Sequence, residues 1–187
     1  MRALVVYESM YGNTHTIAQL VAEGLGTDYE VDVRPVGEVD GTDAAEVDLL
    51  VVGGPTHAHG LSTHSTREGA AAAKDPSLEL EPPAARRGVR EWLVGLPEAH
   101  EPAAAFDTRV RGPALLTGRA SRQIARQLLK HGAQLVAAPE SFLVDRHHHL
   151  LESERDRARS WGARVASAAL HRPNASEHRP DEASGSR

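Results

Sequence analysis

Short apolar runs that alternate with longer segments of helical periodicity are the feature that most limits how this chain can fold. Two of these runs, RALVVY at residues 2–7 and DLLVVGG at residues 48–54, are almost continuously apolar, as strands buried on both faces are. Three further strands are predicted, at residues 29–36, 103–110 and 133–145, the last with Pro139 as a candidate break.

Helices are predicted between these strands. After the first strand, apolar residues from Ile17 to Leu25 recur at helical spacing, with Thr14 available as a side-chain cap near the helix start. Residues 119–131 predict a second helix that stops at Gly132, and residues 150–171 predict a last one. Alternation of strands and helices indicates an α/β fold in which helices cover both faces of a parallel sheet.

Length and composition set the class of protein. The 187 residues suffice for one domain, expected at residues 1–172, and the polar residues 173–187 are expected to form a disordered tail. The formal net charge of −5 argues against a nucleic-acid or anionic-membrane partner. There is no cysteine, so disulfides and thiolate chemistry are excluded. The apolar start is too short for a signal peptide or a membrane span, and we expect a cytoplasmic protein.

The loops that follow the first, third and fourth predicted strands are the candidate binding loops. In parallel sheets of this kind, ligands bind outside the carboxyl ends of the strands, where the strand order reverses. The three loops read ESMYGNT, GGPTHAHGLST and DTRVRGP, and they are rich in glycine, hydroxyl residues or histidine, whereas the strands are not.

The first loop has the composition of a phosphate site. A run of backbone amides that leads into a helix N-terminus attracts an anion, and Gly12 lets the main chain approach closely. Ser9, Asn13 and Thr14 add neutral donors, and the loop holds no Lys or Arg. The patterns for nucleoside triphosphates and dinucleotides are both absent, which leaves a small monophosphate. The alternative is a tight turn with a capping hydroxyl.

The segment VVYESMYGNTHTIA resembles the phosphate-binding fingerprint of flavodoxins and flavodoxin-like proteins, and DLLVVGGPTHAHGLS and AAAFDTRV resemble the strands and loops beside their flavin. The resemblance covers roughly residues 1–165. It implies a doubly wound five-stranded parallel sheet of order 2-1-3-4-5, with FMN at the switch point between the first and third strands. It also implies a redox partner protein or a small quinone-like acceptor.

Carried over onto this sequence, the resemblance implies two groups of site residues. The phosphate of FMN would be held by Ser9, Met10, Tyr11, Gly12, Asn13 and Thr14. The isoalloxazine would lie between two further sets, Pro55, Thr56 and His57 on one side and Asp107, Thr108 and Arg109 on the other. The aromatic flanks and acidic surroundings of many electron-transfer flavodoxins have no counterpart in these loops.

Two classes of function stay open on the sequence. The first is an FMN-dependent redox protein, with an electron carrier favoured over a small quinone-type reductase; the Wrb-type quinone reductases share the SMYG opening. The second is a regulatory or binding module that holds FMN weakly or not at all. No metal site is expected, because His57, His59 and His64 have no Asp, Glu or Cys beside them in their loop. The sequence assigns no role to residues 147–149 and no oligomeric state.

Overall fold

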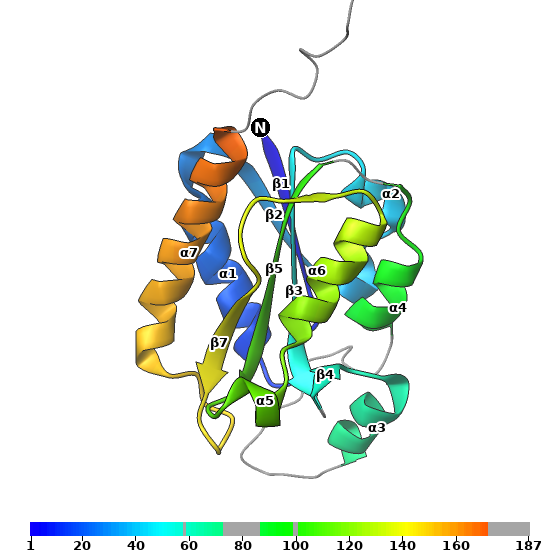
Figure 1. The fold of residues 1–187 in the computed structure, drawn as a ribbon, viewed down its shortest axis with the longest axis vertical. Coiled ribbons are helices and arrows are strands. Elements are labelled where there is room, and N and C mark those ends of the chain that lie inside the picture. Colours follow the sequence, from blue (N-terminus) through cyan, green and yellow to red (C-terminus); the bar gives the residue numbers. More distant parts are fainter. Residues whose placement is uncertain (58, 73–86, 99–100, 172–187) are drawn as a thin grey trace, which may run out of the picture.

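The computed structural model describes residues 1–57, 59–72, 87–98 and 101–171. Parallel strands build the centre of its one sheet, in the order β2-β1-β3-β5-β6 (Figure 1). The strands are β1 (Arg2–Tyr7), β2 (Glu30–Pro35), β3 (Leu49–His57), β4 (Gly60–Leu61), β5 (Pro102–Val110), β6 (Gln134–Leu135) and β7 (Glu140–Val144).

The fifth position of the sheet is shared by two short strands. Both β6 and β7 pair with β5 in parallel, β6 at Pro102 and Ala103 and β7 from Phe106 to Val110. The interruption between them ends at Pro139, as expected of a residue that cannot donate to a strand ladder. The predicted α/β fold with strand order 2-1-3-4-5 is therefore confirmed, with β5 as its fourth strand. The antiparallel pairing of β4 with β3 was not predicted.

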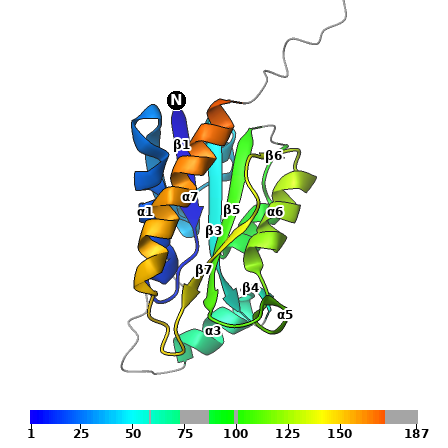
Figure 2. The same ribbon diagram turned by 60° about the vertical axis from the view of Figure 1, so that its left-hand side comes forward.

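Helices cover both faces of the sheet (Figures 1 and 2). On one face lie α1 (Asn13–Leu25) and α7 (Glu152–Leu170). On the other lie α4 (Val89–Val94) and α6 (Ala120–Lys130). The short elements are η1 (Gly26–Asp28), η2 (Val36–Glu38), α2 (Gly41–Ala44), α3 (His64–Ala72) and α5 (Ala114–Thr117). Among the described residues, no helix combines the length and the apolarity needed to cross a lipid bilayer.

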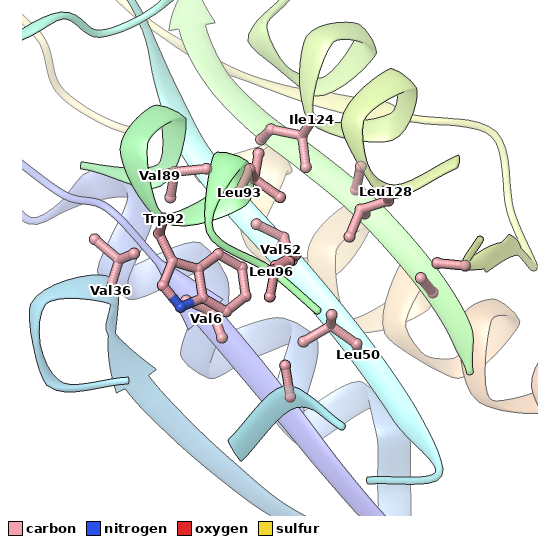
Figure 3. Close-up of a cluster of buried hydrophobic side chains, with 14 of the residues drawn as sticks. Val6, Val36, Leu50, Val52, Val89, Trp92, Leu93, Leu96, Ile124 and Leu128 are labelled. Atoms are coloured by element: carbon pink, nitrogen blue, oxygen red, sulfur yellow. The ribbon is translucent and has the colours of Figure 1, made fainter. Parts of the chain in front are cut away.

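Each face of the sheet has its own apolar core. Figure 3 shows the core under α4 and α6, which contains the fully buried Trp92 together with Val6 of β1 and Val52 of β3. The core under α1 and α7 is centred on Phe106, Phe142 and Trp161, whose rings meet edge to face with centroids 6.0–6.1 Å apart. These two cores hold the sheet rigidly between the helices and so fix the loops at its carboxyl edge.

Close backbone packing between α1 and α7 sets the position of α1. A Cβ on Gly162 would lie 2.3 Å from the carbonyl oxygen of Val21, and one on Gly24 would lie 2.1 Å from the carbonyl oxygen of Arg159. Arg159 also binds Glu23 across the two helices at 2.6 Å. The two helices therefore touch through glycines, and neither can accept a side chain there without moving.

The glycine contact predicts opposite effects for the same substitution in two helices. Gly162→Ala forces α7 away from α1, and we expect it to lower the free energy of unfolding by roughly 1–3 kcal/mol, as overpacking does. Gly69→Ala in α3 meets nothing within 4 Å, so the gain in helix propensity is expected to raise stability by about 0.5–1 kcal/mol. Urea unfolding of both variants measures this, and equal effects would contradict the close contact.

Candidate functional site

A pocket lies at the carboxyl edge of the sheet. The strands β1, β3, β5 and β7 run towards this edge, which is at the lower end of Figure 1. The first, second and third predicted loops all reach it, and so does the loop after β7. It encloses about 80 Å³, less than the roughly 300–1,000 Å³ of pockets that take a whole drug-sized ligand. Its walls are Met10, Tyr11, Asn13, Thr14, Pro55, Thr56, His57, Thr108, Arg109, Val110, Val144 and His148. None of these described residues is acidic.

The loop after β1 ends in a helix start with no side-chain cap. Gly12 precedes α1 with φ +80°, a left-handed conformation that suits glycine, and its missing Cβ would meet nothing within 4 Å. The first turn of α1 contains no acidic residue. Within the described chain, the backbone amides of Asn13 and Thr14 have no acceptor. Open space and unpaired amides together form a cradle of the kind that binds an anion.

Thr14 does not cap α1, and that expectation was wrong because the helix already begins at Asn13. The Thr14 side chain instead points into the sheet, where its hydroxyl lies 2.8 Å from that of Thr108 on β5. Both residues are buried, and both line the pocket. This hydroxyl pair fixes the first turn of α1 against the fourth strand of the sheet.

The loop after β7 also reaches the pocket, which sequence reasoning missed. His148 has φ +61°, an uncommon conformation for a histidine, and its ring lies 5.5 Å from that of Tyr11. Its carbonyl oxygen accepts a hydrogen bond of 2.6 Å from the side-chain amide of Asn13. Asn13 therefore connects the first loop to the last, and His148 forms a wall beside Tyr11.

The second loop folds back on itself as a hairpin between β3 and β4, which puts His57 opposite Gly60. Burial, followed by the nearby His148 and Arg67, lowers the pKa of His57, so this imidazole is neutral at neutral pH. The hydroxyl of Thr56 accepts a 3.0 Å hydrogen bond from the amide of Ala120, at the start of α6. This wall is thus fixed to α6.

Asp107 and Arg109, which follow one another on one face of β5, have different places. The guanidinium of Arg109 lines the pocket and donates to the carbonyl of Gly112 and the hydroxyl of Thr117, both at 2.9 Å. The carboxylate of Asp107 is fully buried and accepts a 2.7 Å hydrogen bond from the amide of Ser121 in the first turn of α6. Asp107 therefore supports α6 and does not reach the pocket wall.

A buried polar network holds the loop after β1 from below. Glu8 accepts hydrogen bonds from the hydroxyl of Ser62 and, at 2.8 Å, from the amide of Val89. Arg67, only 1% exposed, donates to Ser62 at 3.0 Å and to Glu91 at 3.1 Å. Burial raises the pKa of Glu8, and the hydrogen bonds and the charge of Arg67 oppose that shift. The network ties the start of the first loop to α3 and α4.

Comparison with known proteins relates this arrangement to one family. The flavodoxin family model matches residues 5–96, which include the end of β1, the first loop, β3 and the second loop. The match relates the chain to the flavodoxins over these residues, and its fold is flavodoxin-like. No curated protein matches it in sequence.

Solved structures of flavodoxins share the fold over most of its length. A flavodoxin from the domain Archaea is 18% identical, with a TM-score of 0.62 over 91% of this chain and 100% of that one. Flavodoxin 1 from Bacillus cereus is 16% identical, with a TM-score of 0.64 over 89% of this chain and 98% of that one. A flavodoxin, WrbA-like protein from Agrobacterium tumefaciens is 20% identical, with a TM-score of 0.56 over 90% of this chain and 97% of that one. At these identities the likeness concerns the fold.

The structure brings most of the expected site residues of this flavodoxin-like protein together. Nine of the twelve line the pocket, and Ser9, Gly12 and Asp107 do not. Ser9 acts within the loop, because its hydroxyl accepts the amide of Gly12 at 3.1 Å. Val110, Val144 and His148 were missed, and only the three consecutive histidines could have drawn attention to the last loop. Within the described part of the chain, no cluster of three or more His, Asp or Glu side chains could hold a metal ion.

The Thr14–Thr108 pair predicts a coupling that a double-mutant cycle measures. Thr14→Val and Thr108→Val each leave one buried hydroxyl without its partner, and each is expected to lower the free energy of unfolding by about 1–3 kcal/mol without any ligand. The double variant removes both hydroxyls, so its loss should be smaller than the sum of the two single losses. Additive losses would show that the two hydroxyls do not interact.

The buried Glu8 predicts a pH dependence of stability with a definite sign. Its raised pKa means that the folded protein binds this proton more tightly than the unfolded chain does. The resulting stabilisation is complete below the ordinary value of 4.5 and is lost as pH rises through the folded pKa. The free energy of unfolding of wild type, relative to Glu8→Gln, should therefore fall from pH 4 towards neutrality. The exposed Glu46→Gln serves as the control, and a difference for Glu8→Gln that rose with pH would contradict the prediction.

Proposed function

We propose that this protein binds FMN at the pocket and carries electrons between redox partners. The observation that carries the proposal is the cradle at the start of α1: unpaired amides at Asn13 and Thr14, open space at Gly12, and no acidic residue in the first helical turn. A phosphate bound there would receive backbone hydrogen bonds and the favourable end of the helix dipole, with no cation required.

The residues around the cradle suit the remainder of FMN. Tyr11, His57 and His148 offer ring faces and polar edges from three different loops, and Pro55, Val110 and Val144 add apolar surface. The described walls hold no carboxylate, so nothing there repels an anionic ligand. Bound FMN would supply reversible one- and two-electron transfer, while the chain binds it, orients it and limits its contact with water.

The small enclosed volume limits how FMN can fit. About 80 Å³ takes a phosphate or one edge of a ring system, so the rest of the cofactor would lie against the outer surfaces of the loops or separate them. The proposed binding is therefore strongest at the phosphate. This distinguishes the proposal from a site that recognises only the isoalloxazine, which riboflavin shares with FMN.

Two alternatives remain within the same fold. A quinone-type reductase is favoured by the neutral, pocket-facing His57, whose ring N–H can donate a hydrogen bond to a bound quinone-like acceptor. NAD(P)H-dependent turnover of a quinone by the FMN-loaded protein would identify it. A cofactor-free regulatory module has no need of an open anion cradle. The cytoplasmic location expected from the sequence stays a prediction.

Titration with FMN and riboflavin tests the proposal. We expect FMN to bind at least ten-fold more tightly than riboflavin, because each hydrogen bond to the charged phosphate contributes ~1.5–3 kcal/mol. Asn13→Asp puts a negative charge at the first residue of α1, so it should weaken FMN binding about ten-fold and leave riboflavin binding unchanged, whereas Thr42→Asp on the distant α2 should affect neither. Flavin fluorescence quenching gives all six affinities. Equal affinity for the two flavins would reject the phosphate site, and binding of neither would favour the regulatory module.

A further inference from the structure

The chain is acidic overall, but one continuous stretch of it is basic. Between Asp107 and Glu140 there is no acidic residue. The cations of this stretch, besides Arg109 in the pocket, are Arg111, Arg119, Arg122, Arg126 and Lys130. All of these except Arg119 and Arg109 are exposed. The stretch forms α5 and α6, which follow one another along one side of the molecule in Figure 1.

These cations have no ionic partner in the described part of the chain. Three of the four arginines of α7 differ, since Arg155, Arg157 and Arg159 each bind a carboxylate. On α6, the exposed Arg126 meets only the carbonyl oxygen of Arg122, at 3.3 Å. The described surroundings of this surface therefore do not neutralise its positive charge.

Large apolar side chains are exposed on the same surface. Leu115 and Leu116 on α5 are 93% and 67% exposed, and Leu129 on α6 is 52% exposed. Beside α6 an open groove of about 460 Å³ is lined by Arg122, Ala125, Arg126, Leu129, Leu135 and Pro139. Exposed cations and exposed leucines therefore both occur along α5 and α6, a mixture of charged and apolar side chains that is typical of protein interfaces.

This surface is attached directly to the walls of the pocket. Arg109 lines the pocket and binds the hydroxyl of Thr117, the last residue of α5. Thr56 lines the pocket and binds the amide of Ala120, the first residue of α6. A protein seated on α5 and the start of α6 would therefore lie within one residue layer of the candidate cofactor site.

We propose that α5 and α6 form a docking surface for an acidic protein that exchanges electrons with the pocket; the electron exchange rests on the proposed function, the docking does not. Unpaired cations select a partner with a negative surface and accelerate its approach. The exposed leucines then bury apolar area at the centre of the contact. A nucleic acid would neutralise the cations but leave these leucines uncovered, and it would be repelled by the remaining, acidic chain.

The test compares two haem proteins of opposite charge as probes, an acidic one (the soluble domain of cytochrome b5) and a basic one (cytochrome c). We expect the full chain, with no flavin added, to bind the acidic probe at low salt and to lose at least ten-fold in affinity at 200 mM salt. Arg122→Glu/Arg126→Glu should weaken this binding at least ten-fold. Arg155→Glu/Arg164→Glu on α7 changes the net charge equally, and it should alter the affinity less than two-fold.

The exposed leucines and the electron exchange have separate readouts. Leu115→Ser/Leu116→Ser should speed dissociation of the acidic probe several-fold and change its association rate little. If the protein holds FMN, the photoreduced form should reduce the acidic probe at least ten-fold faster than the basic one. Failure to bind FMN would reject the proposed function and leave the docking result standing. Preference for the basic probe, equal loss in the two double-arginine variants, or tighter binding of a 20-base-pair DNA duplex would overturn the docking proposal.

Discussion

The hydroxyl–hydroxyl contact between Thr14 and Thr108 is the interaction on which the geometry of the site most depends. Two short side chains, 94 positions apart in the sequence, meet at 2.8 Å inside the protein and fix the first turn of α1 to the end of β5. The residue before α1 is Gly12, which has no side chain, so the start of α1 has no side-chain cap and its first backbone amides are left for a ligand. The helix end is thus held in place by the sheet and stays available to an anion.

Acidic groups near the site are turned away from the pocket. Glu8 accepts hydrogen bonds from Ser62 and Val89 behind the first loop, and Asp107 supports the first turn of α6. Burial raises the pKa of both carboxyls, so keeping them there costs stability. In return, both loops are fixed by strong hydrogen bonds, while the described pocket walls carry no negative charge that would repel a phosphate.

The sequence predicted the sheet better than it predicted the site. Strands β1 and β3 are continuously apolar because helices cover both faces, and such runs can be recognised without a structure. The site depends on side-chain direction at loop ends and on contacts between distant segments. Side chains alternate along β5, so Thr108 points towards Thr14 and Asp107 points to the other face of the sheet. The register of β5 in the sheet therefore decides which of its residues faces the pocket. His148 reaches the pocket only because β7 pairs with β5.

The distribution of charge follows from the same arrangement. Arg109 is held by the carbonyl of Gly112 and by Thr117, so its charge supports α5 from beneath and the surface above it receives no compensating carboxylate. In the described walls the pocket therefore combines neutral donors with one fixed cation, and positive charge continues outward along α6. An acidic partner that approached along this gradient would meet the exposed Leu115 and Leu116 beside the pocket. Attraction at long range and apolar contact at short range would then act at one place, the edge of the candidate cofactor site.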